Sequence, residues 1–129
     1  MLEIFLPFPP SVNGYWGFSG SRRFLTSKAT AFKAVTKERF KSTGHLGLGK
    51  ARLFITLTLH APDKRVRDID NVVKSTLDAL CQAGVFEDDG QVDVLLVKRA
   101  VPMKGGSCVV RIEEIISAPS AKCSESEAK

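Results

Sequence analysis

One segment near the middle of the chain limits the possible folds more than any other. Apolar side chains occupy every second position of ARLFITLTLH, residues 51–60: Leu53, Ile55, Leu57 and Leu59. Because successive side chains of a strand point to opposite faces, this spacing predicts a strand with one buried face. A sheet with one apolar face needs helices to cover it, which favours an α+β architecture.

Two helices are predicted to cover that sheet. Between residues 69 and 81, apolar side chains recur at the spacing of one helix face, and Gly84 stands where a C-cap belongs. A second helix is expected from Ser27, which can cap a helix, to about Lys41. Its expected apolar stripe comprises Ala31, Ala34, Val35 and Phe40.

Three further strands are expected. Residues 2–6 alternate before Pro7, and residues 92–101 and 108–115 are expected to pair in antiparallel fashion across PMKGGS. The stretch from Pro9 to Ser27 is rich in glycine, serine and proline, which indicates a long loop. The prediction is a single α+β domain: a small four-stranded mixed, mostly antiparallel sheet with about two helices packed on one face.

Residues 1–116 carry all of these elements, whereas residues 117–129 are small, polar and aperiodic, which is typical of a flexible tail. No apolar run approaches the roughly 18 residues of a spanning helix, and the N-terminus lacks a secretory signal. We therefore expect a cytoplasmic protein without a membrane partner. The cysteines Cys81, Cys108 and Cys123 show no CxxC spacing, so we expect reduced, structural thiols.

The net charge of +5 conceals a division along the chain. Residues 1–60 hold nine basic and two acidic side chains, whereas residues 61–116 hold eight basic and ten acidic ones. A basic half attracts polyanions such as nucleic acid, while clustered carboxylates repel them unless something positive intervenes. A divalent cation would resolve this conflict. Charge alone favours the simpler interpretation that both are solvated faces.

Carboxylates gather around the start of the helix predicted after residue 68. Asp68 and Asp70 are two residues apart, so in an extended segment both side chains face one point. The helix that follows would rise about 20 Å, and an extended segment from Gly84 to Asp89 can retrace about 17 Å. Asp89 can therefore just return to the helix start. Oxygen ligands of this kind suit Mg²⁺.

The same residues also have structural interpretations. Asp68 or Asp70 could be an ordinary N-cap, and Lys74, one turn after Asp70, could form a surface ion pair. Tyr15 and Trp16 could stack on bases, or they could equally be core aromatics. Spacing alone leaves these alternatives open.

Four motifs, taken together, resemble the RusA-type Holliday junction resolvases of phages and prophages. They are PFPPSVNGYW, RRFLTSKA, PDKRVRDIDNVVKSTLDAL and AGVFEDDGQVD, and the resemblance extends from about residue 2 to 116. It implies a small homodimeric, Mg²⁺-dependent endonuclease that cuts four-way DNA junctions by paired symmetric cleavage, in DNA recombination and repair. By position, the family's catalytic acids match Asp68, Asp70 and Asp89, and its catalytic lysine matches Lys74.

This resemblance agrees with the chemistry that the charges suggest. Asp68, Asp70 and Asp89 are assigned as ligands of Mg²⁺, for which Mn²⁺ is expected to substitute, and Asp68 could instead orient the attacking water. Lys74 would neutralise a phosphate or stabilise the transition state. If the match between the family's motif and this sequence is off by one residue, the ligand is Asp88 in place of Asp89. No small-molecule cofactor is expected.

Contacts with the DNA backbone are expected from basic residues near the motifs and from the N-terminal loop: Arg22, Arg23, Arg65, Arg67, Asn13 and Tyr15. The rival hypothesis is a non-catalytic phage nucleic-acid-binding protein whose carboxylates only cap and solvate. It explains the charge asymmetry equally well. It gives no reason for three acids and a lysine to coincide.

Overall fold

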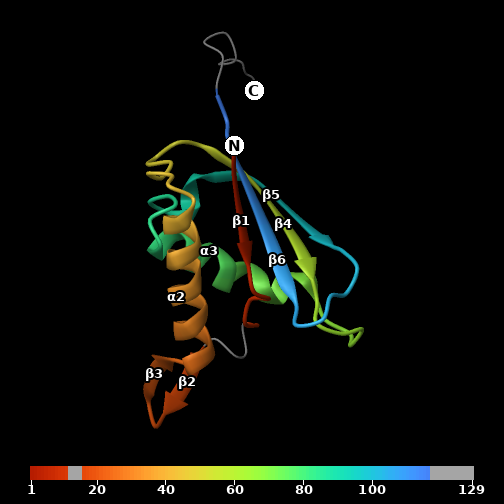
Figure 1. The fold of residues 1–129 in the computed structure, drawn as a ribbon. Coiled ribbons are helices and arrows are strands. Elements are labelled where there is room, and N and C mark those ends of the chain that lie inside the picture. Colours follow the sequence, from red (N-terminus) through yellow and green to blue (C-terminus); the bar gives the residue numbers. More distant parts are fainter. Residues whose placement is uncertain (12–15, 117–129) are drawn as a thin grey trace, which may run out of the picture.

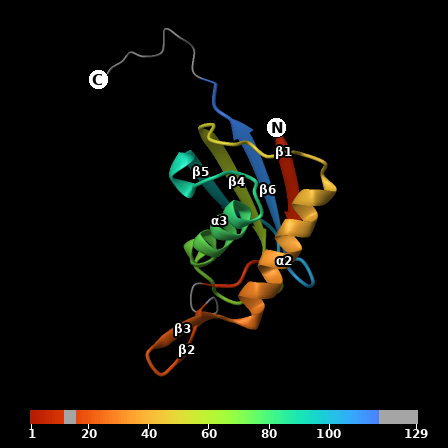
Figure 2. The ribbon, with the colours of Figure 1, turned by 90° about the vertical axis from the view of Figure 1, so that its left-hand side faces the viewer.

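The computed structural model describes residues 1–11 and 16–116, which form a helical layer on one face of a sheet (Figure 1). The sheet has the order β1-β6-β4-β5 and comprises β1 (Leu2–Leu6), β6 (Ser107–Glu114), β4 (Leu53–His60) and β5 (Val92–Arg99). Helices α2 (Ser27–Ser42) and α3 (Val73–Gln82) lie on the same side of it, in front of the sheet in Figure 2. The predicted α+β fold is confirmed. Within the described ranges, neither helix is long and apolar enough to cross a membrane.

The strand pairing differs from the prediction. Strand β6 pairs antiparallel with both β1 and β4, whereas β4 and β5 run parallel and are connected through α3. The predicted antiparallel pairing of residues 92–101 with 108–115 is therefore wrong. The helical layer buries alternate residues of β1, β4 and β6, among them Cys108, Val110 and Ile112, whereas β5 is largely exposed and lies at the sheet edge.

The core lies between the sheet and the two helices. Strand β4 buries alternate side chains as predicted, each of Leu53, Ile55 and Leu57 being fully buried. Complete burial of one such side chain contributes roughly 1.5–3 kcal/mol to folding. Both described cysteines are free, and burial raises the pKa of the Cys108 thiol to about 12. Cys123 and the rest of the predicted tail lie outside the described residues.

Helix α2 begins at Ser27, but its N-cap is the preceding Thr26, whose hydroxyl accepts a hydrogen bond from the Ala29 backbone N–H at 3.3 Å. The expected apolar stripe is only partly confirmed: Phe40 is buried, but the other buried residues of α2 are Ala29, Phe32 and Thr36. The two phenylalanines present the largest apolar surface on the helix, and the smaller Ala31 and Ala34 remain exposed.

Part of the expected long loop is a β-hairpin. Strands β2 (Trp16–Ser19) and β3 (Arg22–Leu25) pair antiparallel and project beyond the N-terminal end of α2 (Figures 1 and 2). The turn between them contains Gly20 at φ +65°, a left-handed conformation that glycine adopts without strain. A Gly-Ser pair between two runs that contain aromatic residues is a hairpin signal, although the surrounding glycine and serine obscure it.

Candidate active site

The first two predicted acids lie where the chain enters α3. Asp68 has an extended backbone, with φ −86° and ψ 132°, and Asp70 lies in the first turn of the 3₁₀ helix η1 (Ile69–Val72). Asp68 occupies the N-cap position of η1, but its side chain makes no cap hydrogen bond. Neither carboxylate forms a hydrogen bond or ion pair with the described residues. Both are therefore available to an external ligand.

The packing of η1 and α3 explains why this entrance is held in place. Val72 is buried, and its carbonyl accepts hydrogen bonds from the Ser75 and Thr76 hydroxyls, at 3.1 Å and 2.7 Å. The Ser75 hydroxyl also donates to the Pro10 carbonyl at 2.7 Å, which ties the start of α3 to the segment that follows β1. Leu80 anchors the far end of the helix in the core. The polar residues of the entrance are thus attached to a rigid element.

Lys74 and Asp89 are brought together. The Lys74 ammonium donates to Asp89 Oδ2 at 3.1 Å, so the predicted return of Asp89 toward the helix start is observed. The hydrogen bond and negative charge of Asp89 raise the pKa of Lys74, which keeps the ammonium charged at neutral pH. Both side chains are substantially exposed, at 69% and 41%, and an exposed pair of this kind contributes only about 0–1 kcal/mol to stability. The partner of Lys74 is Asp89 and not Asp70.

The neighbouring Asp88 has a structural role. Its Oδ2 accepts a hydrogen bond from the Gly90 N–H at 3.0 Å, as part of a capping box around the 3₁₀ helix η2 (Asp89–Gln91). A capping box satisfies backbone donors at a helix start. The geometry therefore directs Asp89, rather than Asp88, toward Lys74.

Sequence reasoning missed Gln91, a buried residue that fixes this turn. Its side-chain oxygen accepts hydrogen bonds from the backbone N–H groups of Glu87 and Asp88, at 3.0 Å and 2.9 Å. Its amide nitrogen donates to the carbonyls of Gly49 and Ala51, at 2.9 Å and 2.6 Å. The D-x-x-Q spacing of the capping box could have indicated the first pair of contacts. The second pair depends on the tertiary fold.

The three acids do not form a closed cluster. Among the described residues, no group of three or more His, Cys, Asp or Glu side chains is arranged to hold a metal ion. The donor chemistry nevertheless fits a hard divalent cation, because Asp68 and Asp70 are carboxylates without a described protein partner. Mg²⁺ commonly takes only one or two carboxylates and completes its shell with water and substrate phosphate.

The basic residues predicted beside the acids differ in their availability. Arg67 donates to Asp63 Oδ1 at 2.7 Å, and its guanidinium lies 5.8 Å from the centroid of the Phe8 ring. The hydrogen bonds from Arg67 and from the Arg65 backbone lower the pKa of Asp63 to about 2. Arg65 is 77% exposed, whereas Arg67 is 25% exposed. The Arg65 guanidinium also pairs with Asp63 Oδ2, at 3.4 Å, but its exposure allows it to exchange this contact for a ligand. Arg67 mainly shapes the loop.

Arg22 and Arg23, also predicted to contact DNA, lie on the β2–β3 hairpin, which is not one of the elements that carry the acids. Predicted Asn13 and Tyr15 lie outside the described residues.

An open groove of about 820 Å³ lies between residues 7–11, the start of α2 and the loop at residues 61–69. Its floor is largely apolar, with Phe8, Phe32 and Leu59 among the lining residues. Lys28 lines one side, and Arg65 and Asp68 line the other. A surface of this kind combines cations for phosphates with apolar contacts.

Comparisons with known proteins identify the family of this chain. Residues 7–113 match the family model described as Endodeoxyribonuclease RusA. The chain is 36% identical over 115 residues to the crossover junction endodeoxyribonuclease rusA of Enterobacteria phage HK97, which covers 89% of this chain and 96% of that protein. It is 37% identical over 115 residues to proteins of that name from Enterobacteria phage 82 and Escherichia coli strain K12, covering 88% of this chain and 94% of each relative. The resemblance indicated by the four motifs is confirmed, and the chain belongs to the RusA family of endodeoxyribonucleases.

Proposed function

We propose that this protein is a structure-selective endodeoxyribonuclease that resolves four-way DNA junctions, with a divalent metal ion, by paired symmetric cleavage in recombination and repair. The observation that carries this proposal is the Lys74–Asp89 pair. It lies one helical turn from Asp70, whose carboxylate makes no hydrogen bond or ion pair with the described residues. The proposed substrate is inferred from the names of the curated relatives, which are crossover junction endodeoxyribonucleases.

The acids would hold the metal ion. Asp70 and Asp89 would be its principal ligands, and Asp68 would be a further ligand or would orient the attacking water. The expected ion is Mg²⁺, with Mn²⁺ able to substitute, because both accept carboxylate and water oxygens. When bound, such an ion supplies an activated water near neutral pH and neutralises charge on the phosphoryl oxygens.

Lys74 would act on the scissile phosphate. Its ammonium remains charged at neutral pH, and its exposure allows it to move from Asp89 to a phosphate oxygen. A fixed cation next to the phosphate stabilises the charge that develops in the transition state. In the free protein the same cation reduces the repulsion that Asp89 would otherwise exert on approaching DNA.

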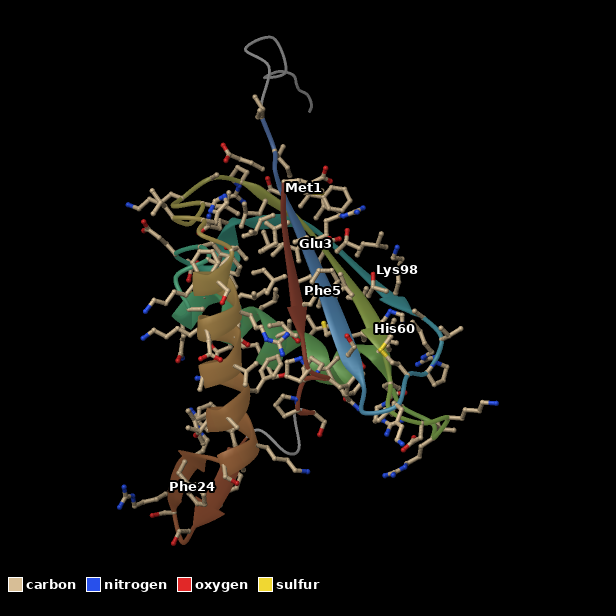
Figure 3. All side chains as sticks on the ribbon, in the orientation of Figure 1. Met1, Glu3, Phe5, Phe24, His60 and Lys98 are labelled. Atoms are coloured by element: carbon tan, nitrogen blue, oxygen red, sulfur yellow. The ribbon has the colours of Figure 1, made fainter. Side chains whose placement is uncertain are left out.

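Resolution also requires two cuts, and a two-fold dimer supplies two identical sites to a junction that can adopt two-fold symmetry. The outer face of the sheet supports a homodimer. No described helix covers this face, which carries Glu3, Phe5 and Lys98 in Figure 3. Phe5 is 56% exposed there, and Val94 and Leu96 are also exposed. An exposed apolar patch of this kind marks an interaction surface, and we assign it to the second subunit.

A cleavage assay tests the proposal. A labelled synthetic four-way junction and a linear duplex of one arm's sequence are incubated with the full chain, with Mg²⁺ and with EDTA. We expect paired, symmetric nicks only in the junction and only with Mg²⁺. Junction binding without cleavage in Mg²⁺ or Mn²⁺ would instead support the non-catalytic nucleic-acid-binding alternative.

A further inference from the structure

The β2–β3 hairpin exposes two phenylalanines that the reaction above does not use. Phe18 is 70% exposed and Phe24 is 47% exposed, on strands that project away from the body of the molecule (Figures 1 and 3). Large apolar side chains gathered on an exposed surface mark an interaction site. The hairpin therefore requires a partner that contacts aromatic rings.

The strand pairing fixes the face of the hairpin on which each aromatic residue lies. Trp16 and Phe18 share one face of the hairpin with Arg23, which is the pairing partner of Phe18, and the Arg23 guanidinium lies 4.0 Å from the Trp16 ring centroid. On the other face the Phe24 ring occupies the space beside Gly17, where a Cβ atom would approach the ring to 2.6 Å. Trp16 and Phe24 are thus held by neighbours on the hairpin, whereas the Phe18 ring projects into solvent beside Arg23.

The charge of this region selects a polyanion. The sequence contains no aspartate or glutamate between Glu3 and Glu38, whereas Arg22 and Arg23 stand on the hairpin and Lys28 follows it. Aromatic rings interleaved with cations form the stacking platforms that bind exposed nucleobases, because every base presents a π-face and every nucleotide a phosphate. A nucleic acid therefore fits this surface better than an apolar protein partner.

The groove beside the candidate active site reaches the start of α2, the helix that directly follows the hairpin. Lys28, at the start of α2, lines the groove of about 820 Å³ whose other side carries Arg65 and Asp68. Figures 1 and 2 both place the hairpin and the loop at residues 61–68 at the same end of the molecule. DNA that lies in the groove with a phosphate near Asp68 can thus extend toward the hairpin.

We propose that the β2–β3 hairpin enters the centre of the junction and that Phe18 stacks on a base exposed at the branch point. This stacking separates the base from its neighbour in the DNA. In the open form of a four-way junction, whose arms do not stack on one another, the central base pairs lack one stacking neighbour, so less stacking energy is lost there than inside a duplex. Phe18 is a substrate-selecting residue in this scheme. The identification of the DNA as a junction rests on the proposed function.

Two fluorescence measurements in EDTA test this role without cleavage. Trp16 is the only tryptophan of the chain and lies on the same hairpin face as Phe18, so its emission reports contact between DNA and the hairpin. Unlabelled junction should quench Trp16, and a second junction with 2-aminopurine at the branch point should brighten as that base unstacks. A duplex with 2-aminopurine at its centre should brighten little.

The Phe18→Ala variant should bind the junction roughly five- to a hundredfold more weakly, the range measured for loss of one base-stacking aromatic. It should also lose the 2-aminopurine response, and Phe18→Tyr should restore both. Leu46→Ala is the matched control, because Leu46 is a fully exposed apolar residue on the loop that follows α2, at the other end of that helix. The emission spectrum of Trp16 in the DNA-free variant shows whether the hairpin keeps its structure.

Wild-type affinity and 2-aminopurine response in Phe18→Ala, with an unchanged Trp16 spectrum, would overturn the role of the hairpin and leave the nuclease proposal intact. Absence of Trp16 quenching in the wild-type protein at saturating junction would overturn it as well. Failure of the wild-type protein to cut the junction in Mg²⁺, together with Trp16 quenching and the 2-aminopurine response, would overturn the proposed function and support the hairpin's role in DNA binding.

Discussion

Replacement of Lys74 by alanine should separate catalysis from binding and from stability. The Lys74–Asp89 pair is exposed on both sides, so its loss should cost about 0–1 kcal/mol of unfolding free energy, or at most about 4 °C in Tm. One lost phosphate contact should lower the salt-dependence slope of DNA binding by only about 0.9. Loss of a cation that stabilises the transition state typically reduces the rate by about 10²–10³-fold, or about 2.7–4 kcal/mol.

The assay pairs a single-turnover cleavage rate in Mg²⁺ with junction affinity in EDTA, both measured across a salt series. Lys74→Arg, which retains the charge with a different shape, should recover part of the rate. Lys41→Ala, which removes one charge from the last turn of α2, serves as the control for net charge. Equal losses in rate and affinity for Lys74→Ala would refute the reasoning and reduce Lys74 to an ordinary backbone contact.

Four further outcomes are expected. Asp70→Asn and Asp89→Asn should each abolish cleavage. Junction affinity, measured by gel shift, should stay equal or tighten, because a negative charge facing DNA is removed. Near-wild-type cleavage by either variant would exclude that residue as an essential ligand. Heterodimers of wild-type and Asp70→Asn subunits should convert a cruciform plasmid mainly to nicked circles, and wild-type yields of linear product without subunit exchange would contradict one site per strand. Gln91→Ala should lower the unfolding free energy by about 1–3 kcal/mol in urea titrations, because it leaves backbone groups that it now bonds unpaired. The pKa of Asp63 is lowered to about 2 in the folded protein, so the stabilising effect of its carboxylate is present above pH 4 and is lost as the pH falls toward 2. The difference in Tm between the wild-type protein and Asp63→Asn should therefore shrink between pH 4 and pH 2. A difference that stays constant over this window would contradict the prediction.

The parts of the fold that follow from local patterns could be predicted from the sequence. The alternation of apolar and polar residues in β4 and the helical spacing of apolar residues in α3 each lie within one short stretch of sequence, and both elements are observed. The neighbours of β6 could not be predicted in this way. A turn signal locates a reversal of the chain, whereas the neighbours of a strand are set by contacts between segments far apart in the sequence, here β6 with β1 and β4.

The candidate site shows the same distinction. The return of Asp89 to Lys74 followed from helix rise and chain length, which are properties of one continuous segment. Gln91 was not predictable as an anchor, because its partners Gly49 and Ala51 are about forty residues away and meet it only through the tertiary fold. The face of α2 was predicted only in part, because Phe32 packs together with the expected Phe40 while the smaller Ala31 and Ala34 remain exposed.

The parallel pairing of β4 with β5 also has an evolutionary consequence. Such a pair requires a crossover connection, and residues 61–91, which form it, contain every group assigned here to the chemistry. The hairpin, α2 and the N-terminal strand belong to a separate stretch of chain, joined to the crossover through anchors such as Ser75 and Gln91. The hairpin and the catalytic residues therefore lie on different stretches of chain, so exchanging residues 1–52 between relatives should change the contacts of the hairpin with DNA while the catalytic residues stay the same.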